Sequence, residues 1–294
     1  MTKILAVLVY PIVIAVLIVV GAVLARRAPR QSPGVTPPAR VPRGQHVATG
    51  GTRGQARGEA TADAGRYLLV FIGGTVVVCF VTVLLGLLVV HNGPAIDKPF
   101  FNWTITHRVH VWASVMKRAT KVGDVWTTWG AAGAAAVCLA VTWRSRRWLP
   151  PLALGSLIVF SKYAVIGIHH FVHRVGPPTS PLGTFPSGGV SRVVVFYGLI
   201  AYLLWREFSG SRRAAIWSAT AVAALAFSEC YSRAYLALHW LTDALSGLVF
   251  GSLLLAVCIA AVRFVAGPPQ APTAAARPAP PAVQSQAAAP EGSA

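Results

Sequence analysis

The feature that most constrains this chain is a series of long apolar stretches. A helix needs about 20 apolar residues to cross the hydrocarbon core of a bilayer, and runs of this kind indicate membrane spans. Seven such stretches occur, at about 4–25, 67–91, 125–143, 149–172, 190–206, 214–231 and 239–265. The sequence therefore predicts an all-α, polytopic membrane protein.

The composition supports this fold class. Of the 294 residues 55 % are hydrophobic and only 12 % are charged, about half the roughly 25 % that is usual in soluble proteins. The four cysteines, Cys79, Cys138, Cys230 and Cys258, all fall inside predicted spans and none has metal-ligand spacing. We interpret them as small buried apolar residues and predict neither a metal nor another cofactor.

The stretches divide the chain into four regions. Residues 1–25 are predicted to be a transmembrane anchor, a retained one rather than a signal peptide, because most of the positive charge follows the apolar run. Residues 26–66, rich in Arg, Gly and Pro, are predicted to be a disordered cytoplasmic linker. Residues 67–266 form a six-helix membrane domain. Residues 267–294, rich in Ala and Pro, are predicted to be a disordered cytoplasmic tail.

The charge distribution indicates which partners the protein binds and how it is oriented in the membrane. The formal net charge is +18, but the arginines cluster beside the apolar stretches and are not interleaved with aromatic residues, so we exclude nucleic acid as a partner. Binding of anionic headgroups stays open. The basic linker and the basic loops around 144–147 and 206–213 belong on the cytoplasmic side by the positive-inside rule. Segment 92–124 is also basic but lies on the outside, where we expect an interfacial amphipathic helix.

Three costly polar residues stand where the sixth and seventh spans meet, in "SRAYLALHWLTDAL". His239 and Asp243 are four residues apart, so one helix would place them on the same face. A carboxylate at that distance fixes the imidazole tautomer and leaves the other nitrogen free as a nucleophile or base. Arg233 offers a fork of donors that suits phosphate oxygens. The alternative is a snorkelling arginine beside an interfacial histidine.

A second segment, "FPSGGVSR", opens the fifth span. Ser187, Gly188 and Gly189 stand at the start of the predicted helix, where free backbone N–H groups and the helix dipole attract anions. Two glycines let an anion approach the backbone. This pattern is also that of an ordinary helix start. The topology places both segments, and the end of the fourth span, at the outer membrane surface.

These residues resemble the signatures of the type 2 phosphatidic acid phosphatase/vanadium haloperoxidase superfamily. The spacing Ser-Arg-x5-His-x3-Asp matches its third signature, "PSG" resembles its second, Pro-Ser-Gly-His, and the six spans resemble its membrane members. The resemblance implies that His239 attacks phosphorus and that Asp243 orients it. It further implies that Arg233, Ser187 and the Gly188 amide hold phosphate oxygens, with Gly189 beside them and no metal.

The chain departs from the family pattern at three positions. The second-signature histidine, which protonates the leaving group, is Gly189 here. The first-signature lysine and arginine fall on His169 and Gly176. We hypothesise that His169 or His173 serves as the acid and that Arg174 or Arg192 replaces the missing arginine. The alternative is that these four residues contact lipid headgroups.

The function predicted from the sequence is a phosphatase for membrane lipid phosphates or diphosphates. It would act at the outer face of the plasma membrane through a phosphohistidine, on a substrate of the prenyl diphosphate or phosphatidate class. A low-pKa leaving group such as pyrophosphate needs an acid least, which favours diphosphates. The alternative is a catalytically impaired relative that binds phosphorylated lipids or a partner without turnover. A haloperoxidase is disfavoured, because the site faces a membrane.

Two further sequence features carry structural expectations. Glu229 stands four residues before Arg233 and is predicted to pair with it and support it. Gly247 and Gly251 have the G-x-x-x-G spacing that lets helices approach closely. For these glycines we favour packing within the chain over a dimer interface.

Overall fold

The computed structural model describes residues 52–143, 146–181 and 185–267. Their helices are α2 (Thr52–Asn92), α3 (Pro94–Thr106), α4 (His110–Ala119), the 3-10 turn η1 (Thr120–Gly123), α5 (Val125–Thr142), α6 (Leu149–Val172), α7 (Gly188–Arg192), the π-helical turn η2 (Val193–Tyr197), α8 (Gly198–Phe208), α9 (Arg212–Tyr235) and α10 (Leu241–Ala266). In this part of the chain six helical segments are long and apolar enough to cross a membrane, and α7, η2 and α8 together make one of them.

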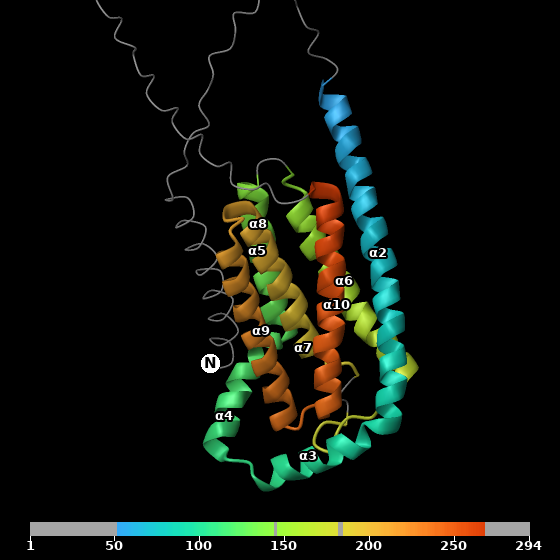
Figure 1. Ribbon diagram of the computed structural model, residues 1–294, viewed down its shortest axis with the longest axis vertical. Coiled ribbons are helices and arrows are strands. Elements are labelled where there is room, and N and C mark those ends of the chain that lie inside the picture. Colours follow the sequence, from blue (N-terminus) through green and yellow to red (C-terminus); the bar gives the residue numbers. More distant parts are fainter. Residues whose placement is uncertain (1–51, 144–145, 182–184, 268–294) are drawn as a thin grey trace, which may run out of the picture.

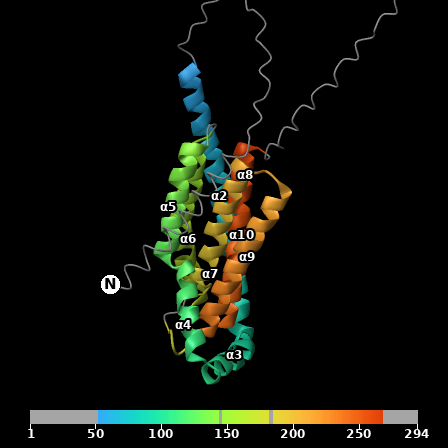
Figure 2. The ribbon, with the colours of Figure 1, turned by 90° about the vertical axis from the view of Figure 1, so that its left-hand side faces the viewer.

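The spanning helices run side by side along the long axis of the molecule, and α3 lies across one end of the bundle (Figure 1). The view turned by 90° shows α3 and α4 at that same end (Figure 2). The connections 107–109, 173–181, 185–187 and 236–240 also lie there, and we call this the site end. An all-α membrane bundle with six spans is thus confirmed. The predicted anchor at 4–25 lies outside the described residues, as do 26–51 and the tail from 268 onward.

Two predictions about the segments before the bundle are wrong in detail. The linker was expected to be disordered through residue 66, but α2 begins at Thr52. Asp63 explains part of this, since its carboxylate accepts a 2.6 Å hydrogen bond from Arg146 and ties the first turns of α2 to the loop after α5. Segment 92–124 was expected to be one amphipathic helix, but it forms α3, α4 and η1.

The break between α3 and α4 is held by the end of α9. Tyr235 accepts a hydrogen bond from the Val109 amide at its hydroxyl, 3.0 Å away, and another from Arg108 at its carbonyl, 3.2 Å away. Ala113 and Met116 of α4 pack in a small cluster with Tyr235. These contacts fold α4 back along α9 and place η1 beside the site.

The glycine pair in α10 packs within the chain, as predicted. A Cβ atom on Gly247 would lie 2.7 Å from the carbonyl oxygen of Ser187, and one on Gly251 would lie 2.9 Å from that of Ser191. Such distances leave no room for a side chain, so α7 rests directly on α10. This close approach fixes where the start of α7 meets the first turns of α10.

Candidate active site

The start of α7 is joined to the first turn of α10 by a backbone hydrogen bond. The Ser187 amide donates to the carbonyl oxygen of Asp243 at 3.0 Å. Ser187 is the N-cap residue of a helical segment that continues from Gly188 to Phe208, and its side chain is fully buried. The positive end of this helix, with its free N–H groups, therefore opens toward the segment that carries the candidate nucleophile.

Two guanidinium groups flank the first turn of α7. A Cβ atom on Gly188 would lie 3.1 Å from Nη1 of Arg192, and a Cβ atom on Gly189 would clash with the guanidinium of Arg233. The Nε of Arg192 donates to the carbonyl oxygen of Gly123 at 3.0 Å, which fixes that side chain. The two guanidinium groups thus lie against neighbouring glycines of the same turn. An anion between them would make charge-assisted hydrogen bonds with both.

Arg233 is anchored by a buried carboxylate. Its Nε donates to Oε1 of Glu229 at 2.5 Å, and the same oxygen accepts a hydrogen bond from the Thr120 hydroxyl at 3.1 Å. A second carboxylate, that of the exposed Asp124, lies 3.6 Å from Nη2 of Arg233. The predicted pairing of Glu229 with Arg233 is confirmed.

Arg174 belongs to a different buried cluster. Its Nη2 donates to Asp97, and its Nη1 donates to Asp243 and, at 2.8 Å, to the Thr242 hydroxyl. Asp97 also accepts hydrogen bonds from the amide and the hydroxyl of Thr242, at 2.9 and 2.7 Å. Both terminal nitrogens of Arg174 are therefore used by carboxylates. The cluster ties α3 and the loop after α6 to the start of α10.

His239 does not stand on the same helix as Asp243, so the expected shared helix face is wrong. Leu241 is the first residue of α10, and Trp240 before it is extended, with φ −62° and ψ 149°. The Trp240 indole donates to the carbonyl oxygen of Val175 at 2.9 Å and so fixes the loop before α10. His239 is 9 % exposed and stands in that loop, two residues before the helix begins.

The remaining candidate histidines stand in different surroundings. His173 is exposed and ends α6 in a left-handed conformation, with φ 48°, and its ring lies 5.4 Å from that of the exposed His170. His169 is half-buried on the helix face of Val165, whose methyl group would lie 3.7 Å from a Cβ on Gly188. The structure therefore brings His169, and not His173, to the side of α6 that faces the start of α7.

Several buried polar atoms have no hydrogen-bond partner among the described residues. They include the Ser187 hydroxyl, Nδ1 of His169 and Oε2 of Glu229. Each belongs to a residue beside α7 or beside the arginines that flank it. Because buried polar groups are nearly always satisfied, this gathering is typical of a site that receives a polar ligand or ordered water.

The sequence did not single out several residues of this site. Segment 92–124, predicted only as an interfacial helix, supplies four of them: Asp97, Thr120, Gly123 and Asp124. One signal could have identified Asp97, since it is one of two acids in a segment otherwise charged by lysines and arginines, near a membrane surface.

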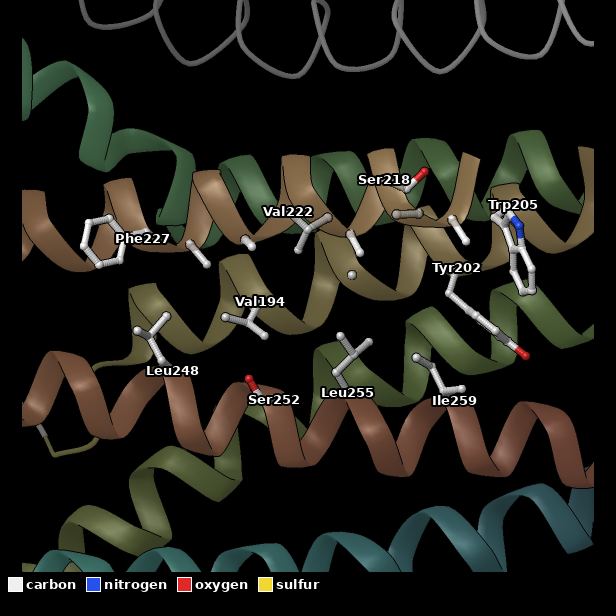
Figure 3. A pocket seen from close by; sticks show the side chains of 16 residues that line it. Val194, Tyr202, Trp205, Ser218, Val222, Phe227, Leu248, Ser252, Leu255 and Ile259 are labelled. Atoms are coloured by element: carbon white, nitrogen blue, oxygen red, sulfur yellow. The ribbon is translucent and has the colours of Figure 1, made fainter. Parts of the chain in front are cut away.

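An apolar groove of about 510 Å³ runs along the bundle between α8, α9 and α10. Figure 3 shows its lining side chains, from Phe227 and Leu248 at one end to Tyr202 and Trp205 at the other. Leu248 also packs against a buried cluster formed by Val190, Cys230 and Ala244. These three residues are neighbours of Gly189, Glu229 and Asp243 in the chain, so the wall of the groove continues to the site.

Comparisons with known proteins agree with this architecture. Residues 173–265 match the model of the PAP2 superfamily. A solved structure described as the first transmembrane PAP2 type phosphatidylglycerolphosphate phosphatase from Bacillus subtilis is similar, with a TM-score of 0.56 and 20 % sequence identity. That match covers 63 % of this chain and 94 % of the other chain. Curated proteins gave no match.

The class that fold and site define is an integral membrane protein with a six-helix bundle and a polar site at one end. Residues 173–265 are similar to the PAP2 superfamily, and the fold is similar to that of a transmembrane PAP2-type phosphatase. The resemblance inferred from the third signature is confirmed at this level. The roles of individual residues are a separate question.

Proposed function

We propose that this protein is a phosphatase for membrane lipid phosphates or diphosphates, and that it forms a phosphohistidine on His239. The observation that carries the proposal is the pair of guanidinium groups of Arg192 and Arg233 at the start of α7. That helix start is in turn bonded to the segment of His239 and Asp243. The arrangement combines a phosphate cradle with a candidate nucleophile.

The cradle has the donors that a phosphoryl group requires. The amides of Gly188 and Gly189, the Ser187 hydroxyl and the two guanidinium groups would bind its oxygens. They would stabilise the charge that develops as the bond to the leaving group breaks. Between the two candidate replacements for the missing arginine, Arg192 is the better placed, because carboxylates occupy both terminal nitrogens of Arg174. Arg174 would hold Asp243 and thereby the start of α10.

The reaction would proceed in two displacements. An imidazole nitrogen of His239 attacks phosphorus, and the bond from phosphorus to the leaving oxygen breaks. Water then attacks the phosphohistidine, which releases inorganic phosphate and restores the imidazole. Because Gly189 supplies no acid, a leaving group that departs as a stable anion is favoured, and His169 is the better placed of the two candidate acids.

The groove supports a lipid as substrate. It follows α10 from Leu248 to Ile259, eleven residue steps, a length of about 16 Å at 1.5 Å per step. A single hydrocarbon or prenyl chain would lie there with its phosphate at the site end. Apart from the aromatic Tyr202 and Trp205, the only polar lining residues are Ser218 and Ser252. The groove therefore suits a chain without polar groups.

The face of the membrane is part of the proposal. Basic residues of the end opposite the site, such as Arg147 and Arg213, favour the cytoplasm for that end, which places the site at the extracytoplasmic surface. The basic residues of α4 argue the other way, since Lys117 and Arg118 lie at the site end. Labelling of single cysteines at these positions with a membrane-impermeant reagent, in whole cells, decides between the two orientations.

The phosphohistidine is tested by trapping. Purified protein is mixed with ³²P-labelled prenyl diphosphate or phosphatidate, quenched in denaturant, and analysed for acid-labile label. We expect label and phosphate release in the wild type and in His170→Ala, an exposed histidine of the same end, and neither in His239→Ala. Binding of these lipids without label or release would instead favour the impaired relative.

A further inference from the structure

Glu229 is an acid that the proposed chemistry does not use. It lies inside the span Arg212–Tyr235 and is 1 % exposed. Charged residues at such positions are costly and tend to be retained for function. Its Oε1 binds Arg233 and Thr120, whereas its Oε2 has no hydrogen-bond partner among the described residues. The carboxylate therefore serves mainly to hold one side of Arg233.

Glycines make room for this pair. A Cβ atom on Gly123 would fall on Oε1 of Glu229, and it would also lie 2.8 Å from the carbonyl oxygen of Gly189. A Cβ atom on Gly189 would fall on Cζ, Nε and Nη2 of Arg233. The carboxylate, the guanidinium and the two glycines thus occupy one small volume, in which no additional side-chain atom fits without displacing another.

We infer that Glu229 is a positioning residue that draws the Arg233 side chain across Gly189, so that the guanidinium takes the space a side chain at position 189 would fill. The inference rests on the proposed function, since it concerns the same phosphate cradle. The pair stands in the order Glu then Arg at i, i+4, the favourable orientation on a helix. Gly189 then leaves the space that the guanidinium occupies, and Glu229 holds the guanidinium there.

The arrangement bears on the substrate class. A guanidinium cannot give up its proton. The Arg233 guanidinium that lies over Gly189 would therefore stabilise a departing oxygen by charge and hydrogen bonding without protonating it. Such a site suits a phosphoanhydride, whose leaving phosphate is stable as an anion, better than a monoester, whose alkoxide needs a proton. We therefore assign lipid diphosphates as the preferred class.

The test is a double-mutant cycle between positions 189 and 229 in the full-length protein. Gly189→Ala should displace Arg233 and lower kcat/KM for a prenyl diphosphate by about 100-fold, the cost typical of a misplaced catalytic group. In the Glu229→Ala background Arg233 is free to move aside, so adding Gly189→Ala should cost less than about threefold. Losses that simply multiply would overturn the inference.

A matched control is available one residue away. Gly188→Ala adds the same methyl group to the same helix turn, but there it meets Arg192 rather than Arg233. Its effect should be the same with and without Glu229. Equal coupling of both glycines to Glu229 would mean a general loosening of α7 and would overturn the inference. Glu229→Gln, which keeps an acceptor for Nε, should retain more activity than Glu229→Ala.

The cycle is also measured without substrate, as the melting temperature of each ligand-free variant in detergent. Gly189→Ala should lower it in the wild type and change it little in Glu229→Ala. If the wild type releases no phosphate from any lipid, the proposed function fails, yet this second cycle still decides whether Glu229 and Gly189 are coupled. Within an active protein, a wild type that hydrolyses phosphatidate as fast as prenyl diphosphate contradicts the assigned substrate class.

Discussion

Two arginines at the site end of the bundle are held in opposite ways. Arg174 gives its terminal nitrogens to Asp97 and Asp243, whereas Arg233 is anchored through Nε by Glu229. The first guanidinium is surrounded by buried carboxylates, and the second lies against Gly189 at the start of α7, with only the exposed Asp124 near one terminal nitrogen. The comparison teaches that the nitrogen used for anchoring decides whether a buried arginine is a structural tie or a ligand-binding group.

The charge of each neighbourhood strengthens this contrast. Around Arg174 two buried carboxylates face one guanidinium, so the formal balance is negative and a phosphate would be repelled. Around Arg233 a second guanidinium, that of Arg192, lies against the neighbouring Gly188, and one of the two nearby carboxylates is the exposed Asp124. Only the second neighbourhood suits an anion.

The largest effect should come from breaking the Arg174 cluster. Asp97→Ala removes one partner of a buried ion pair and a cap of α10, and it leaves Arg174 with one carboxylate. We expect a loss of about 3–5 kcal/mol in stability, measured by thermal or denaturant unfolding in detergent. The exposed neighbour Lys98 provides the control, since Lys98→Ala should change stability little. Equal stability of the two variants would mean that the cluster is not a structural tie.

Replacement of Arg233 should act mainly on chemistry. It should cost less stability than breaking the Arg174 cluster, because Glu229 keeps the hydrogen bond from Thr120. Arg233→Ala should lower kcat/KM by about 10²–10³, as for loss of one donor that stabilises developing charge. Arg233→Lys should restore little, because lysine cannot bind Glu229 through one nitrogen and present two others. Arg118→Ala, an exposed arginine on α4, is the control and should leave the rate unchanged. A melting temperature that falls as far as in Asp97→Ala would erase the contrast between the two clusters.

Much of this fold follows from local sequence. Apolar runs located five of the six described spans, and the end of the other, to within a few residues, because the bilayer sets their length and composition. The start of α2 was missed, since its extension depends on the contact between Asp63 and Arg146, which are 83 residues apart. One interfacial helix was predicted within segment 92–124 from its mixture of aromatic and basic residues, which does not reveal that Tyr235 holds a break there.

The candidate site was predictable where its parts lie close in sequence. The pair of Glu229 and Arg233 follows from spacing alone. The pairing of Arg174 with Asp97 could not be predicted, because Asp97 lies in another element and no sequence pattern links the two residues. His239 was placed on a helix because its spacing to Asp243 fits one, but the extended Trp240 between them begins the helix later.

The two histidines proposed as acids should differ in their effect on the rate, because only His169 faces the candidate site. His169→Ala should lower phosphate release by about 100-fold, the lower end of the range for a general acid, because His169 faces the start of α7. His173→Ala should change the rate by less than about twofold, since its exposed ring lies beside His170. The measurement is kcat with a phosphatidate, which depends on an acid more than a diphosphate does. A larger loss in His173→Ala would reverse the assignment, and no loss in either variant would remove both residues from the chemistry.

The smallest effect should come from Asp124, the exposed counter-ion of Arg233. Its side chain is 54 % exposed and its carboxylate lies 3.6 Å from Nη2, so the pair is worth at most about 1 kcal/mol. Asp124→Asn frees that nitrogen and should tighten inhibition by inorganic phosphate by less than about fivefold. The effect should shrink at high salt, because exposed charges are screened. Weaker inhibition in Asp124→Asn would show that Asp124 orients Arg233 as Glu229 does, and the difference between buried and exposed anchors would then disappear.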